Sequence, residues 1–180
     1  MPVTPLHAGF VWPLKVLFKK RLDFIVLTVG AMLPDLELPV FYILTGGEYS
    51  RLILHSFAGG ILIGIPLALL ISYLFFSFVP VKFLKEKFNL NYEFLKPQNP
   101  LFSKTAFLSA FIGVMSHVIA DVFMRHGSEI SPWFWPFSDE KVLILLFNDA
   151  FLSALFTALI ALVLIVLSAI SFIKNPELVK

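Results

Sequence analysis

Two long stretches without a charged residue constrain this chain more than any other feature. Leu52–Val81 runs for 30 residues, and Ala150–Ile173 for 24, without Asp, Glu, Lys or Arg. A helix of about 20 apolar residues crosses the hydrocarbon core of a bilayer, so both stretches predict membrane-spanning helices.

Three further apolar segments surround these stretches, and each is short or interrupted. Residues 6–18 are apolar but few, and residues 103–124 carry Asp121 near their end. Residues 22–44 contain the sequence Leu33-Pro34-Asp35-Leu36-Glu37-Leu38-Pro39, whose prolines and acids predict a broken helix. We therefore expect one all-α integral membrane domain over residues 1–180. Its expected helices are 6–18, 22–44, 54–80, 103–124 and 142–173, the first two forming a broken or half-length N-terminal hairpin.

The composition supports a lipid bilayer as the main partner. Only 14% of the residues are charged and the mean hydropathy is +0.89, whereas a soluble protein carries about 25% charged residues. A net charge of +2 argues against nucleic-acid binding. Since the chain has no cysteine, a thiolate zinc site and a cysteine nucleophile are excluded. The oligomeric state stays open.

The basic residues indicate an orientation in the membrane. Of the 14 Lys and Arg residues, all but Arg51, Arg125 and Lys141 fall on one side of the expected helices. By the positive-inside rule that side is cytoplasmic, so the basic loop 82–104 and the C-terminus face the cytoplasm of a multi-pass cell-membrane protein. The aromatic segment 131–137 then lies at the outer interface.

Seven ionisable residues lie within or beside the apolar segments: His7, Asp35, Glu37, His55, His117, Asp121 and His126. Charged groups in hydrocarbon are costly, so such residues usually face one another, water or a ligand. If Lys19-Lys20-Arg21 is a turn, His7 lies 14 residues before Arg21 and Asp35 lies 14 residues after it. At ~1.5 Å per helical residue, both stand roughly 21 Å from the turn. We expect the group to converge in the outer half of the membrane.

Each member of this group has a structural alternative. His117 and Asp121 share a helix face at the i, i+4 spacing and suit one metal ion, yet they equally suit a hydrogen bond between helices or an Asp121–Arg125 pair. Asp35 lines a cavity or caps a turn. Glu37 is a ligand or reaches water, and His55 is a ligand or an interfacial residue.

Imidazole and carboxylate ligands without cysteine favour Zn²⁺, with Mn²⁺ or Fe²⁺ as alternatives. The predicted metal ligands are His7, Asp35, His55, His117, Asp121 and His126, with Asp35, His117 and Asp121 as catalytic residues. A metal with an open coordination position activates water, which predicts a hydrolase acting on a phosphoester or lipid headgroup. A transporter, a proton relay or a structural membrane protein would use the same residues.

The motifs also resemble a known family. They are Met1-Pro2-Val3-Thr4-Pro5-Leu6-His7-Ala8, Leu33-Pro34-Asp35-Leu36-Glu37, His55-Ser56, Gly113…Ser116-His117…Asp121 and Gly127…Trp135-Pro136-Phe137. Together they look like an uncharacterised family of small prokaryotic membrane proteins, the YdjM-like "membrane-bound metal-dependent hydrolase" group, which is distantly similar to zinc-dependent phospholipase C. The resemblance implies metal or catalytic roles for the six residues given above. The phospholipases hold three zinc ions with more ligands than this chain offers, so one metal, or at most two, is expected here.

Overall fold

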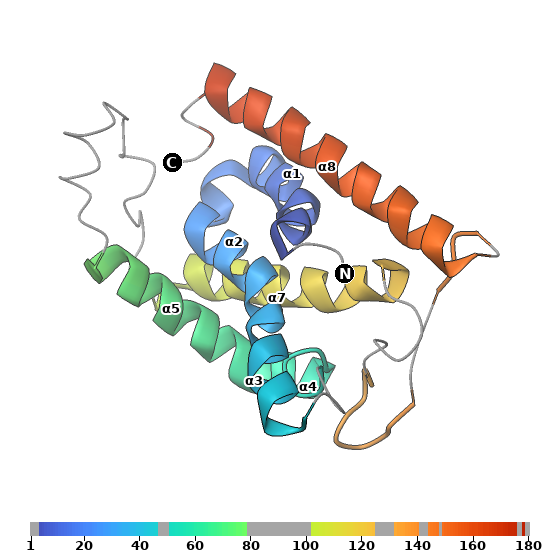
Figure 1. Ribbon diagram of the computed structural model, residues 1–180. Coiled ribbons are helices and arrows are strands. Elements are labelled where there is room, and N and C mark those ends of the chain that lie inside the picture. Colours follow the sequence, from blue (N-terminus) through green and yellow to red (C-terminus); the bar gives the residue numbers. More distant parts are fainter. Residues whose placement is uncertain are drawn as a thin grey trace.

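The chain is helical in the computed structural model, which describes residues 4–46, 51–78, 102–124, 132–140, 144–147, 149–175 and 178 (Figure 1). The principal helices are α1 (Ala8–Phe18), α2 (Phe24–Met32), α3 (Glu37–Leu44), α5 (Ile65–Phe78), α7 (Lys104–Met124) and α8 (Ala150–Lys174). No β-strand occurs among the described residues, which confirms the all-α prediction.

Within the described part of the chain, four helical segments are long and apolar enough to cross a membrane. They are Phe24–Leu44, Phe57–Phe75, Lys104–Phe123 and Phe151–Lys174. In contrast, α1 has only 11 residues and contains Pro13, so the first arm of the N-terminal hairpin is short, as expected. Most of the predicted basic loop and His126 lie outside the described residues.

A buried lysine holds the turn of this hairpin. The turn is the 3₁₀ segment η2 (Lys19–Arg21), in which Lys19 has a positive φ of 45°. Lys15 is buried in α1, and its Nζ donates to the carbonyl oxygens of Lys19 (2.9 Å) and Leu22 (2.8 Å). A cation at the C-terminal end of a helix is favourable because the helix dipole is negative there. Asp23 then begins α2 by accepting the N–H groups of Ile25 and Val26, each at 3.1 Å.

The predicted break between α2 and α3 is a tight turn in a continuous helical path. Residues Leu33–Leu36 form the 3₁₀ segment η3, with Pro34 in its first turn. Proline has no N–H to donate to the preceding turn, so the α-helical pattern cannot run through it unchanged. The tightened turn buries both Asp35 and Glu37.

Glycines let α2 and α7 approach closely at the centre of the molecule (Figure 1). A Cβ atom on Gly113 would lie 2.5 Å from the Leu27 carbonyl oxygen, and one on Gly30 would lie 3.0 Å from that of Ala110. Close packing of this kind is typical of helix pairs in membranes. Gly60 and Gly64 allow similar close packing, because both glycines face the Val114 side chain of α7.

Candidate metal centre

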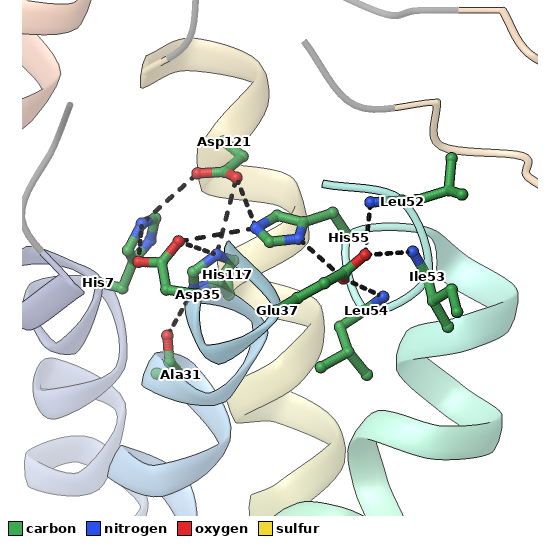
Figure 2. Close-up of polar contacts among 10 residues, drawn as sticks. All are labelled: His7, Ala31, Asp35, Glu37, Leu52, Ile53, Leu54, His55, His117 and Asp121. Atoms are coloured by element: carbon green, nitrogen blue, oxygen red, sulfur yellow. Dashed lines mark hydrogen bonds and ion pairs between the residues drawn. The ribbon is translucent and has the colours of Figure 1, made fainter. Parts of the chain in front are cut away.

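Five of the six predicted ligands converge in one buried cluster (Figure 2). They come from the 3₁₀ segment η1 (Thr4–His7), η3, the turn before the short helix α4 (Phe57–Gly59), and α7. The members of this His/Asp cluster are His7, Asp35, His55, His117 and Asp121.

The two carboxylates of the cluster lie between the three imidazoles. Asp121 lies 3.5 Å from the Nε2 atoms of His7 and of His55, and 3.7 Å from that of His117. Asp35 lies 3.6 Å from His117 Nε2, 3.7 Å from His55 Nε2 and 4.0 Å from His7 Nε2. Every imidazole thus presents Nε2 to both carboxylates.

A backbone carbonyl sets the orientation of His117. Its Nδ1 lies 2.7 Å from the Ala31 carbonyl oxygen. Because that oxygen can only accept, Nδ1 carries the proton and donates. In the neutral imidazole, Nε2 then presents its lone pair to the carboxylates. A histidine ligand of a metal ion is commonly held in this way by its other ring nitrogen.

Glu37 contacts Nδ1 of His55, as the Ala31 carbonyl contacts Nδ1 of His117. Its Oε2 lies 3.3 Å from His55 Nδ1, and both side chains are buried. The same carboxylate accepts the N–H groups of Leu52 and Ile53 at 2.6 Å and of Leu54 at 2.5 Å (Figure 2). Glu37 therefore secures the segment that leads into His55, as well as one ring nitrogen of His55 itself.

These distances fit a cation between the donors. An imidazole lone pair and a carboxylate oxygen repel each other unless a proton or a metal ion lies between them. Hydrogen bonds between charged groups are about 2.7–2.9 Å long, shorter than the 3.5–4.0 Å separations from Nε2 to carboxylate oxygen. Donors around a tetrahedral Zn²⁺ with bonds of about 2.0–2.1 Å lie roughly 3.3 Å apart. The cluster is thus close to the spacing that a metal ion requires.

Two overlapping triads in the cluster could hold a metal ion. One is His7, His117 and Asp121, and the other is Asp35, His55 and His117, with the ligand atoms of each within 4.8 Å of one another. Both triads use His117, whose Nδ1 is taken by Ala31. Because one nitrogen cannot ligate two ions, the two triads indicate one shared metal position and not two independent sites.

A family model matches this chain over residues 1–178, and it describes a domain of unknown function, DUF4184. The chain belongs to the DUF4184 family. No curated protein and no solved structure matches it. Membership of an uncharacterised family is therefore confirmed, whereas no named relative supports the YdjM-like hydrolase assignment.

Glycine packing and a helix cap place the cluster residues of this DUF4184 member. The contact of Gly113 with α2 brings His117 within reach of the Ala31 carbonyl. Ser56, next to His55, caps the following helix by accepting the Gly59 N–H at 3.0 Å.

Two contributors were not among the predicted site residues. Glu37 was expected to be a ligand or to reach water, yet it is only 4% exposed and binds three backbone N–H groups. The expectation that it reaches water was wrong. Its place two residues after Asp35 was the available signal. No sequence signal could have identified the Ala31 carbonyl, because every residue has a backbone carbonyl. His126, the sixth predicted ligand, lies outside the described residues.

Proposed function

We propose that this DUF4184 member is a membrane-embedded metalloprotein with one divalent transition-metal ion in the His/Asp cluster. Asp35, His55, His117 and Asp121 hold the ion, and His7 supplies a fifth ligand or an acid–base group. One observation carries the proposal: three imidazole Nε2 atoms face two buried carboxylates at distances of 3.5–4.0 Å. His126 remains a proposed further ligand.

Charge balance supports a divalent ion. Asp35 and Asp121 are both buried among helices apolar enough to cross a membrane. Two ionised carboxylates in such surroundings cost several kcal/mol unless they are compensated. One divalent cation neutralises both of them. The neighbouring Glu37 is compensated separately by its three backbone N–H groups.

The donor set suits Zn²⁺ first, with Mn²⁺ and Fe²⁺ as alternatives. Imidazole ligands suit Zn²⁺ and Fe²⁺, and carboxylate ligands suit Mn²⁺. A catalytic zinc ion would take three of the proposed ligands and leave one position for water. The five available ligands also allow a six-coordinate ion with one open position.

We further propose that the centre hydrolyses a phosphoester, with a lipid headgroup as the favoured substrate. A bound divalent metal with an open position makes hydroxide available near neutral pH. Asp35, His117 and Asp121 orient the ion, and a carboxylate oxygen or imidazole that is not a ligand accepts the proton of the attacking water. Apolar helices flank the cluster, which favours a substrate that is itself part of the bilayer.

Elemental analysis of the detergent-purified protein tests the metal centre. We expect about one equivalent of transition metal per chain after reconstitution with Zn²⁺ or Mn²⁺, and loss of that metal in His117→Ala and Asp121→Ala. Asp23→Asn is the matched control, because asparagine caps a helix as well as aspartate does and Asp23 caps α2 away from the cluster.

Both outcomes of this experiment are informative. A folded wild-type protein that stays metal-free after reconstitution contradicts the metal centre and favours a proton relay or a structural role. If metal binds, release of phosphate or diglyceride from short-chain phospholipids is measured with and without a chelator. Metal binding without chelator-sensitive hydrolysis would retain the centre and reject the hydrolase.

A further inference from the structure

A second feature lies at the other end of the N-terminal hairpin. The η2 turn, the last residues of α1 and the described residues after α8 line an open cavity of about 810 Å³. Its lining residues are Leu17, Phe18, Lys19, Lys20, Arg21, Asn175 and Leu178. His7 and Asp35 each lie 14 residues from Arg21, or roughly 21 Å at the rise of a helix. The cavity is therefore separate from the His/Asp cluster.

The walls of this cavity combine positive charge with apolar surface. The η2 turn contributes three exposed cations, and the lining residues that the structure describes include no acidic side chain. The nearby Asp23 directs its carboxylate to the N–H groups that begin α2. Leu17 and Phe18 are exposed beside the cations, at 71% and 47%. A ligand that is anionic at one end and apolar at the other complements this surface.

The cations are held on a rigid frame. Lys15 fixes the turn by donating to the Lys19 and Leu22 carbonyls. Phe172 brings the end of α8 to the hairpin by packing edge-to-face against Phe24 at 5.3 Å and Trp12 at 5.9 Å. The positive-inside rule requires only charges at this face of the membrane, and it accounts for neither a fixed turn nor a cavity between two helix ends.

We propose that this cavity binds the phosphate headgroup of an anionic lipid. Arg21 and the two lysines contact the phosphate oxygens, since guanidinium forms paired hydrogen bonds with phosphate and ammonium acts as a point charge. Leu17 and Phe18 contact the start of the acyl chains. Basic pockets between membrane helices bind anionic headgroups in this way. The proposal does not depend on the metal centre.

Lipid titration monitored by native mass spectrometry tests the site in the full-length, delipidated protein. The probes are phosphatidylglycerol and phosphatidylcholine in detergent, and the test variant is Lys20→Gln/Arg21→Gln. The matched control is Lys104→Gln/Lys174→Gln, which also removes two exposed positive charges from residues that do not line the cavity. Each basic residue near anionic lipid contributes roughly fivefold in affinity.

We expect wild type to prefer phosphatidylglycerol, the test variant to bind it about 25-fold more weakly, and the control to stay within about threefold of wild type. Equal losses in both variants would show general charge attraction and overturn the site, as would equal binding of phosphatidylcholine. Displacement of the lipid by glycerol 3-phosphate at equal concentration would overturn a lipid ligand in favour of a soluble phosphate ester. The affected residues are exposed, so unchanged thermal unfolding is expected in both variants.

Discussion

Replacing Glu37 by Gln tests the link between the His/Asp cluster and the structure around it. Glutamine keeps the shape of the side chain but exchanges one acceptor oxygen for a donor NH₂ group. The amide oxygen can replace Oε1, which accepts the Leu52 and Ile53 N–H groups. The NH₂ group then takes the place of Oε2 and faces two donors, the Leu54 N–H and His55 Nδ1.

The magnitude follows from these lost contacts. Leaving a buried donor without its acceptor costs about 1–3 kcal/mol, and two donors lose theirs, so we expect about 2–6 kcal/mol of destabilisation. His55 also loses the partner that orients its imidazole. Removing such a partner of a metal ligand typically costs about 10–100-fold in metal affinity.

Two measurements on purified protein separate these effects. Thermal unfolding in detergent reports the stability, and competition with a zinc chelator at a temperature where the variant is folded reports the affinity. Glu140→Gln is the control, because Glu140 is exposed. If Glu37→Gln is folded and binds zinc as tightly as wild type, Glu37 does not orient His55, even though the metal centre itself stands.

Three further predictions follow from the packing and the donor set. Gly113→Ala places a methyl group 2.5 Å from the Leu27 carbonyl oxygen, so it should separate α2 from α7 and abolish metal binding. The nearest contact of a methyl group in Gly64→Ala is a Val114 side-chain carbon at 3.1 Å, so this variant should retain the metal in the same elemental analysis. Lys15→Met removes the hydrogen bonds to the partly buried Lys19 carbonyl and the buried Leu22 carbonyl. It should lower the unfolding free energy by about 2–4 kcal/mol, measured by denaturant titration, whereas equal stability would show that the turn forms without the lysine. Acidification should release the metal, because protons compete for imidazole and carboxylate ligands; a dialysis series in which metal content does not change down to about pH 5 would contradict these ligands.

Much of the fold follows from local sequence features. Uncharged apolar stretches predict helices wherever they occur, because backbone groups in hydrocarbon must be satisfied within the helix. Pro34 predicts an interruption because proline lacks an N–H. The constant rise of a helix places His7 and Asp35 at one depth on either side of a turn. The remaining members of the His/Asp cluster were found because they are ionisable residues within or beside apolar segments.

The position of a residue along its helix does not determine how the helix is rotated or how it crosses its neighbours. Only the tertiary structure decides the rotation and the crossing. His7 and Asp121 lie 114 residues apart in the chain, yet His7 Nε2 comes within 3.5 Å of the Asp121 carboxylate. The close approach of α2 and α7 turns His117 toward the Ala31 carbonyl. The sequence alone determined which polar side chains must find partners in an apolar environment. Which nitrogen faces which oxygen depends on backbone groups and long-range packing, and these have no pattern in the sequence.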